Sequence, residues 1–272
     1  MLVTKAGSLF VAQRDPTERA TMQDASLPLV CIHGAGGTHQ HWSYQWPRLS
    51  HSTQVVVPDL PGHGRSPGPG CCTIAAYSAV LLAILDALNL EQVLLAGHSM
   101  GGAIVLWTAL VAPTRVAGLV LIGTGARLPI LPMLLEEFEH DPSTAIRLIV
   151  ERAYGPQATP ELRAMGAAAF HQIDPLVFRG DLQACQAYTL MQHIHNVQCP
   201  TLVLCGSADQ VTPPKFSQYL HTHIRGSRLA LVPDAGHMVL LEHPETVYQA
   251  LAGLVREIPH KKVTKVCRAV YH

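Results

Sequence analysis

The chain has 272 residues, carries 19 Lys and Arg residues against 19 Asp and Glu residues, and only 14% of its residues are charged. This length is enough to bury a sizeable core in one large domain or two small ones. The formal net charge of zero argues against nucleic acid and against an anionic membrane surface as partners. No apolar run reaches the ~18 residues of a membrane-spanning helix, and residues 1–15 do not have the pattern of a signal peptide. We therefore expect a small-molecule substrate, and the composition leaves both a monomer and a homodimer open.

Seven cysteines are scattered along the chain, and none has the spacing of a zinc site. Cys31 and Cys205 fall within apolar runs, where cysteine usually acts as a small buried side chain. Cys71 and Cys72 are too close together for an ordinary disulfide. The pattern favours a reducing compartment, so we expect a cytoplasmic location.

Short apolar runs rich in β-branched residues recur along the chain, each closed by Gly, Pro, His or Asp. They cover residues 27–33, 53–59, 91–97, 117–123, 200–206 and 227–233. Nearly continuous apolarity is typical of parallel strands that are buried on both faces. Stretches with helical spacing lie between them, at residues 74–89, 100–113, 216–224 and 245–258. The alternation predicts an α/β fold with a mostly parallel, doubly wound sheet.

The alternation is interrupted once, between Arg127 and about Tyr188, where several helical segments follow one another without a strand-like run. We interpret residues 125–189 as a helical cap insertion over the carboxyl ends of the strands, where open α/β sheets bind ligands. Residues 1–124 and 190–259 then form the two parts of the core domain. Residues 260–272 are expected to form a basic, solvated tail.

The stretch LLAGHSMGGA, residues 94–103, places Ser99 between a predicted strand and a predicted helix. So tight a turn strains the backbone of the central residue and admits only small neighbours, a requirement that Gly97 and Gly101 meet. The turn also presents the serine hydroxyl at a helix N-terminus, whose free N–H groups and dipole suit an oxyanion. The pattern predicts that Ser99 is a nucleophile.

A serine nucleophile needs a base, and the base needs a third group that fixes its tautomer. Among 16 histidines, His237 follows the last strand-like run in a Gly-containing loop and is the predicted base. Asp209 follows the preceding run within GSADQVTPP and is the predicted orienting acid. Asp234 shares the loop of His237, and Asp59 lies in a Gly- and Pro-rich turn, so neither is preferred.

Two backbone N–H groups are predicted to form the oxyanion hole. Met100 follows Ser99 directly, and Ala35 lies in the glycine-rich loop HGAGG, residues 33–37. That loop lacks the Lys-Ser/Thr ending of a phosphate-binding loop. The His-x-His pairs at 193–195 and 221–223 have no nearby carboxylate or thiol. We therefore predict neither a metal site nor a cofactor.

The motifs HGAGG, PDLPGHGRS, GHSMGG, GSADQVTPP and AGHMVLLEHPE, in this order, resemble those of the α/β-hydrolase superfamily. The resemblance covers about residues 27–257, and the chain order Ser, Asp, His agrees with it. It implies the α/β-hydrolase fold with a helical cap and the roles already assigned to Ser99, Asp209 and His237. The strand-to-helix turn at Ser99 is called the nucleophile elbow. It carries serine here, whereas the dehalogenases and epoxide hydrolases of the superfamily carry aspartate at this position. The resemblance therefore points to the branch of small, cap-bearing serine esterases and C–C hydrolases.

Substrate specificity is expected to depend on the cap. Asp181, within FRGDLQAC, is the one cap carboxylate whose setting allows it to point inward, with surface exposure as the default. Arg127 and Arg179 are the cap-hinge candidates for binding a single carboxylate. The apolar residues predicted to line the substrate pocket are Leu128, Ile130, Leu131, Met133, Leu134, Phe138, Met165, Phe170 and Met238.

We predict a serine hydrolase that cleaves a small, largely apolar carboxylic ester through an acyl-enzyme on Ser99. One alternative keeps the triad and cleaves a C–C bond of a diketone-like substrate. Another transfers the acyl group to an acceptor other than water, as acyltransferases and perhydrolases do. A binding protein without catalysis is a third alternative, and it predicts the loss of a triad residue, whereas all three are present.

Overall fold

A computed structural model of the chain describes residues 1–14, 26–130, 132–170 and 172–258. The basic tail that the sequence suggests at 260–272 lies outside these residues. The described strands are β1 (Leu2–Thr4), β2 (Gly7–Leu9), β3 (Val11–Arg14), β4 (Leu29–Ile32), β5 (Val55–Pro58), β6 (Val93–His98), β7 (Val116–Ile122), β8 (Thr201–Gly206) and β9 (Arg228–Val232).

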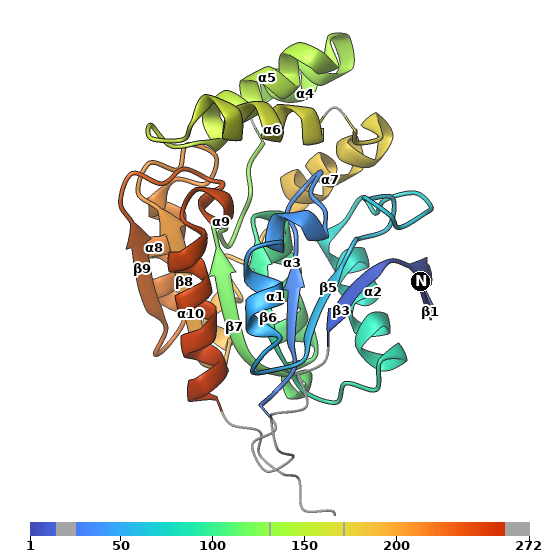
Figure 1. Cartoon of the computed structure of the whole chain (residues 1–272), viewed down its shortest axis with the longest axis vertical. Coiled ribbons are helices and arrows are strands. Elements are labelled where there is room, and N and C mark those ends of the chain that lie inside the picture. The colour runs from blue at the N-terminus through green and yellow to red at the C-terminus, as the bar shows by residue number, and fades with distance from the viewer. Residues whose placement is uncertain (15–25, 131, 171, 259–272) are drawn as a thin grey trace, which may run out of the picture.

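Seven of these strands form the central sheet, in the order β3-β5-β4-β6-β7-β8-β9 (Figure 1). The strands from β4 to β9 are parallel and coincide with the six predicted runs, so the predicted α/β class with a mostly parallel sheet is confirmed. The edge strand β3 pairs antiparallel with β5 and was not predicted. β1 and β2 form a separate two-stranded sheet.

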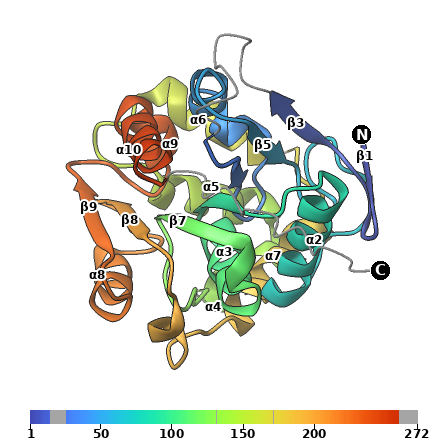
Figure 2. The ribbon, with the colours of Figure 1, turned by 90° about the horizontal axis from the view of Figure 1, so that it is seen from below.

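Helices cover both faces of the sheet (Figure 2). In β4, Val30 and Ile32 belong to the apolar core under α2 (Ile74–Ala87), α3 (Met100–Val111) and α8 (Pro214–His223). Leu29 and Cys31 belong to the core under α1 (Gln45–Leu49), α9 (Val239–Glu242) and α10 (Pro244–Glu257). Successive side chains of a strand point to opposite faces, so burial on both faces explains the continuous apolar runs. Short 3₁₀ turns lie at His39–Trp42, Pro113–Arg115 and Ile194–Asn196.

Four further helices lie between β7 and β8 in the chain, in the segment interpreted as a cap. They are α4 (Pro132–His140), α5 (Pro142–Ala153), α6 (Pro160–Phe170) and α7 (Pro175–Ala187). An antiparallel bridge joins Arg127 to Thr189, so the segment leaves the core and returns to it at one point. In Figure 1, α4, α5 and α6 lie above the carboxyl ends of the strands.

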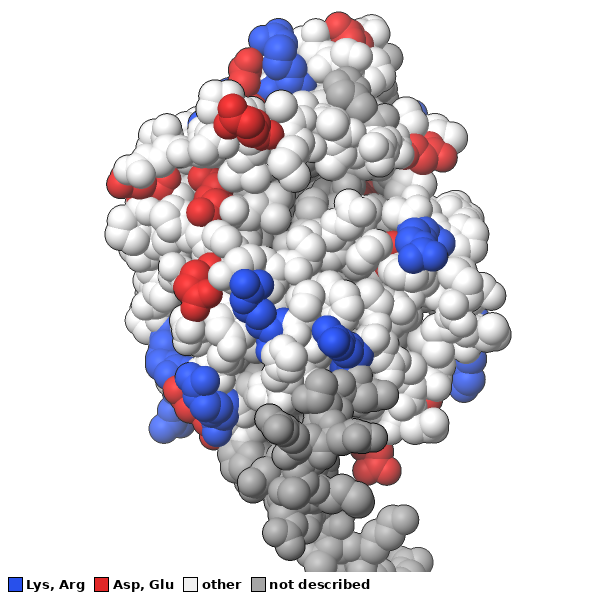
Figure 3. All heavy atoms as spheres, in the orientation of Figure 1, with Lys and Arg blue, Asp and Glu red and all other residues white. Residues whose placement is uncertain are grey.

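Charged side chains of both signs are dispersed over the surface, and on the face in Figure 3 neither sign forms a continuous patch. Within the described ranges, no helix combines the length and the apolar character that crossing a bilayer requires.

Candidate active site

Ser99 occupies the sharp turn between β6 and α3 that the sequence predicts. Its φ angle is 54°, a conformation that costs a non-glycine residue of order 1–3 kcal/mol. The Ser99 N–H donates to the Ile122 carbonyl at 2.9 Å, and the Thr124 hydroxyl donates to the Ser99 carbonyl at 2.8 Å. A Cβ atom at Gly97 would collide with the backbone of Gly101. The surrounding structure therefore holds Ser99 in its strained conformation.

Asp209 and His237, which are 28 residues apart in the chain, meet beside this turn. His237 Nδ1 lies 2.9 Å from Asp209 Oδ2, and both residues are buried. Asp209 also accepts hydrogen bonds of 2.8 Å from the backbone N–H groups of Val211 and Thr212 and from the Thr212 hydroxyl. The loop after β8 thus fixes the carboxylate on one side while His237 approaches from the other.

The charge state of Asp209 determines which nitrogen of His237 carries a proton. Burial alone would raise the pKa of Asp209, but the charge of His237 and hydrogen bonds from His237 and Thr212 outweigh it and lower this pKa. The ionised carboxylate can only accept, so Nδ1 of His237 carries the hydrogen and donates it. Nε2 of the neutral ring is then left with a lone pair, as a general base requires.

A second histidine supports the backbone of His237. His98 Nε2 donates to the His237 carbonyl at 2.9 Å, and the centroids of the two rings are 4.8 Å apart. Burial and the neighbouring charge of His237 lower the pKa of His98 well below its ordinary value, so this ring is neutral. Nothing in the sequence beyond its place next to Ser99 signalled this role.

The two residues predicted to supply the oxyanion hole flank Ser99. Met100 is the first residue of α3. Ala35 lies in the loop after β4, and this loop passes so close that a Cβ atom at Gly34 would lie 3.0 Å from the Cβ of Ser99. Ala35 and Ser99 line the same pocket. Oxyanion stabilisation needs two backbone N–H groups beside the nucleophile, and the positions of both predicted residues are compatible with this role.

A buried carboxylate from the cap holds this loop. Asp181 on α7 accepts hydrogen bonds from the Gly36 N–H at 2.8 Å, from Nε2 of His63 at 2.7 Å and from the Tyr77 hydroxyl at 2.5 Å. It is fully buried, so Asp181 points inward and the default expectation of surface exposure is wrong. The reason is that Asp181 on α7 reaches three donors that need an acceptor: Gly36 in the loop after β4, His63 in the loop after β5 and Tyr77 on α2.

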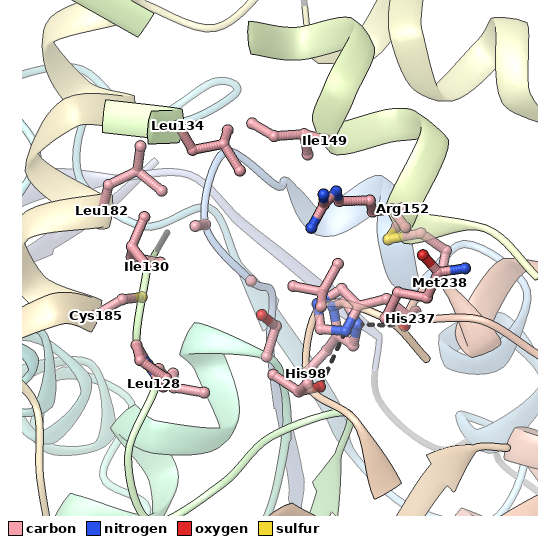
Figure 4. Close-up of a pocket in the computed structure, with 18 of the residues that line it drawn as sticks. His98, Leu128, Ile130, Leu134, Ile149, Arg152, Leu182, Cys185, His237 and Met238 are labelled. Atoms are coloured by element: carbon pink, nitrogen blue, oxygen red, sulfur yellow. Dashed lines mark hydrogen bonds between the residues drawn. The ribbon is translucent and has the colours of Figure 1, made fainter. Parts of the chain in front are cut away.

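A pocket of about 300 Å³ opens above Ser99, His98 and His237 (Figure 4). Of the residues predicted to line it, those in contact with the cavity are Leu128, Ile130, Leu134, Phe170 and Met238. Leu131 and the side chain of Met133 lie outside the described part of the chain.

Two of the predicted pocket residues were wrong. The side chain of Met165 is 69% exposed. It lies five residues before Phe170 on α6, about 140° around the helix, and so points away from the cavity. Phe138 is buried behind the pocket wall, with its ring centroid 5.1 Å from that of Phe178, and it is Phe178 that contacts the cavity.

Sequence reasoning missed one face of α7 and one of α5. Phe178, Leu182 and Cys185 contact the cavity from α7, and Ile149 and Arg152 contact it from α5. Both sets have the spacing of one helix face, a signal that was available in the sequence.

The prediction that the cap-hinge arginines bind a substrate carboxylate was wrong too. Arg127 and Arg179 are exposed and do not line the pocket, and at the hinge it is the apolar neighbours Leu128 and Ile130 that line it. Arg152 is the cap arginine that reaches it. In the described ranges, His, Cys, Asp and Glu side chains form no group of three or more that is suited to hold a metal ion.

Comparison with known proteins agrees with this geometry. The model of the family described as "Alpha/beta hydrolase family" matches residues 29–250. The chain belongs to this family. Its motifs at the elbow and in the loop after β4 are therefore those of an α/β hydrolase, and the chain is a hydrolase of this fold.

Among similar proteins is a pimeloyl-(acyl-carrier protein) methyl ester esterase of Neisseria meningitidis serogroup C, 29% identical over 90% of this chain and 98% of its own length. A 3-oxoadipate enol-lactonase 1 of Acinetobacter baylyi is 24% identical over 95% of this chain and 97% of its own. The crystal structure of a hydrolase from Pseudomonas aeruginosa PA01 superposes with a TM-score of 0.83 and 27% identity, and it covers 93% of this chain and 97% of its own. By their names, the first of these relatives is a methyl ester esterase and the second is an enol-lactonase.

Proposed function

We propose that this α/β hydrolase cleaves small, largely apolar carboxylic esters through an acyl-enzyme on Ser99. The observation that carries the proposal is the buried hydrogen bond of 2.9 Å between His237 and Asp209 in the same pocket as the strained Ser99. A serine at the nucleophile elbow with a buried His–Asp pair beside it is the arrangement in which a general base activates a serine nucleophile. The esterase and lactonase relatives support the same chemistry.

In the first half-reaction, Ser99 Oγ attacks the ester carbonyl carbon while His237 Nε2 takes the hydroxyl proton. The carbonyl oxygen becomes an oxyanion and accepts hydrogen bonds from the Ala35 and Met100 N–H groups. Collapse of this intermediate breaks the bond to the alcohol oxygen. His237 returns the proton to that oxygen, so a neutral alcohol leaves and an acyl group remains on Ser99.

In the second half-reaction, His237 takes a proton from water, and the water oxygen attacks the acyl carbon. The same two N–H groups stabilise the second oxyanion. When it collapses, the bond to Ser99 Oγ breaks, the serine recovers a proton from His237, and the carboxylic acid product leaves. Asp209 stays ionised throughout and stabilises the imidazolium that forms in each half.

The size and lining of the pocket limit the substrate. A cavity of about 300 Å³ is at the small end of the usual range for ligand sites. Aliphatic and aromatic side chains from the cap, among them Leu134, Ile149 and Phe178, form most of its upper wall. The substrate is therefore short, and its acyl or alcohol part is mainly apolar.

The compartment belongs to the same proposal. The cysteines within the described ranges are free thiols, including the neighbouring Cys71 and Cys72. Free thiols of this number favour a reducing, cytoplasmic location.

The test is hydrolysis of nitrophenyl esters of increasing acyl length by the wild type, by Ser99→Ala and by Ser43→Ala. Ser43 is an exposed serine that does not line the pocket, and it controls for the chemical change. We expect turnover by the wild type and Ser43→Ala, with a preference for short acyl chains, and none by folded Ser99→Ala. A folded wild type that cleaves no ester would refute the ester hydrolase and favour C–C cleavage or acyl transfer.

A further inference from the structure

Resting on the proposed function, we infer that the substrate carries a carboxylate on the arm that lies under α5, and that Arg152 binds this carboxylate. Arg152 is the second-last residue of α5 and lines the pocket above His237 and Met238. In Figure 4 its side chain extends from the helix into the cavity, below Ile149 and Leu134. The guanidinium therefore faces the space in which a substrate arm must lie.

The C-terminal end of α5 is fixed to the loop that carries His237. The Met238 N–H donates to the Ala153 carbonyl at 2.9 Å. Glu242 accepts from the Gly155 N–H at 2.7 Å and from the Gly236 N–H at 3.0 Å. The backbone next to Arg152 is therefore hydrogen-bonded to the loop that carries His237. These bonds fix the position of the Arg152 backbone relative to His237.

The charges that line the pocket all have one sign. Among the described residues in its wall, Arg152 and Lys215 are basic and none is Asp or Glu. Lys215 is exposed at the rim, where a solvated charge contributes little. Arg152 is half-buried among apolar side chains, where the lower dielectric strengthens attraction to an anion.

Arg152 also differs from the other arginines of the cap. Arg147 pairs with Glu151 at 3.2 Å, which directs this neighbouring carboxylate away from Arg152. Arg163 donates to the Gly155 carbonyl at 2.5 Å. Within the described part of the chain, no carboxylate or carbonyl oxygen lies within bonding distance of Arg152. A guanidinium is always charged, and a partly buried one without a counter-charge is unfavourable until an anion arrives.

The geometry of the group selects the anion. A guanidinium donates two parallel N–H groups, which match the two oxygens of a carboxylate. One such cation balances one negative charge, and a pocket of about 300 Å³ has no room for a bulky anion. A short ester or lactone that ends in a carboxylate therefore fits both the charge and the size of the site.

The test compares pairs of esters with the same number of carbon atoms, in which the second member carries a free carboxylate and the first does not. The first pair is nitrophenyl pentanoate against the nitrophenyl monoester of glutaric acid, which places the carboxylate on the acyl arm. The second pair is the butyrate ester of 4-hydroxybenzamide against that of 4-hydroxybenzoate, which places it on the alcohol arm. Each ester is measured with the wild type, Arg152→Gln and Arg147→Gln, the last being the same change on an exposed, paired arginine of the same helix.

In one of the two pairs, Arg152→Gln should lower kcat/KM on the charged ester by about 10- to 100-fold, the range of a hydrogen-bonded ionic contact. On the neutral ester the change should stay below about threefold, and Arg147→Gln should leave both rates unchanged. If the wild type cleaves neutral esters and Arg152→Gln changes charged and neutral esters equally in both pairs, the carboxylate subsite is refuted and the ester hydrolase stands.

Calorimetric titration with glutarate and with pentanoate separates binding from turnover. Glutarate should bind the wild type more tightly than pentanoate does, and Arg152→Gln should weaken glutarate binding about tenfold or more. If glutarate binds in this way but the wild type hydrolyses no ester, the proposed ester hydrolase is refuted and the carboxylate subsite stands. Equal glutarate affinity in the wild type and Arg152→Gln would refute the subsite.

Discussion

Replacing Asp181 by Asn removes the charge that ties the cap to the loop after β4 and leaves the size of the side chain unchanged. The carboxylate accepts from Gly36, His63 and Tyr77 and is fully buried. An amide in its place presents an NH₂ group to at least one of these donors, so at least one buried donor loses its acceptor and His63 loses its counter-charge. Because Gly36 adjoins Ala35, the loss also loosens the loop that is proposed to supply an oxyanion donor.

The ion pair of Asp181 with His63 sets the size of the effect. Burial lowers the pKa of His63, but the hydrogen bond and the charge of Asp181 outweigh it and raise this pKa above its ordinary value. The other ring nitrogen faces the Pro61 carbonyl at 3.0 Å, so protonated His63 donates on both sides. Removing one partner of a buried pair costs about 3–5 kcal/mol. For a chain of this size that corresponds to a fall in Tm of roughly 6 to 20 °C.

The assay measures Tm and kcat for the wild type, Asp181→Asn and Asp174→Asn. Asp174 caps the same helix from the surface, accepting from the Leu176 N–H at 2.8 Å, and Asn caps helices equally well. We expect Asp174→Asn to match the wild type. Asp181→Asn should melt at the lower temperature and lose about tenfold in kcat, less than the 10²–10³ of a deleted oxyanion donor.

The pH dependence of this difference follows from the raised pKa of His63. The stability that protonated His63 supplies is complete below the ordinary histidine pKa of about 6.5 and is lost as pH rises through the raised value. The gap in Tm between the wild type and Asp181→Asn should therefore narrow at alkaline pH. An Asp181→Asn variant that melts within a degree of the wild type at pH 6 with full kcat would refute the reasoning.

Three further predictions concern the pocket and its triad. Asp209→Asn should lower kcat by about 10⁴-fold through the wrong tautomer of His237, and near-normal ester hydrolysis by this variant would contradict the choice of acid. A general base must be unprotonated to take the serine proton, so turnover should fall as the pH is lowered; a flat pH–rate profile would argue against His237 as the base. Leu134→Ala removes a side chain from the upper wall of the cavity, so the preferred acyl chain in the nitrophenyl series should lengthen by about one or two carbons; an unchanged preference would place the acyl arm elsewhere.

The parallel part of the fold was predictable because its strands are buried on both faces. Runs such as residues 200–206 are apolar throughout, and the Gly and Pro residues beside them mark their ends. The edge strand β3 has no such signal: it is four residues long, half of them exposed, and its partner Val55–Pro58 lies more than 40 positions away. Pairing at a solvent-exposed edge depends on tertiary structure rather than on a local pattern.

The residues proposed to do the chemistry were predictable because each has a local requirement. Ser99 needs small neighbours, and Asp209 and His237 follow strands whose ends meet at one edge of the sheet. The cap is different. The sequence periodicity of α6 does not show which of its faces turns toward the pocket. Both Phe170 and Met165 were therefore predicted to line the pocket, and only Phe170 does so. Arg152 was missed because a charged residue is assigned to solvent unless the orientation of its helix is known.

The central claim is that Ser99 carries the acyl group during turnover. The most direct measurement mixes the enzyme with nitrophenyl acetate, quenches it in acid within the first turnover, and locates the added acetyl group by mass spectrometry of the peptides. We predict one acetyl group on the peptide that contains Ser99 in the wild type, and none on the corresponding peptide of Ser99→Ala. Acetylation at another residue, or ester hydrolysis that persists in Ser99→Ala, would contradict the account.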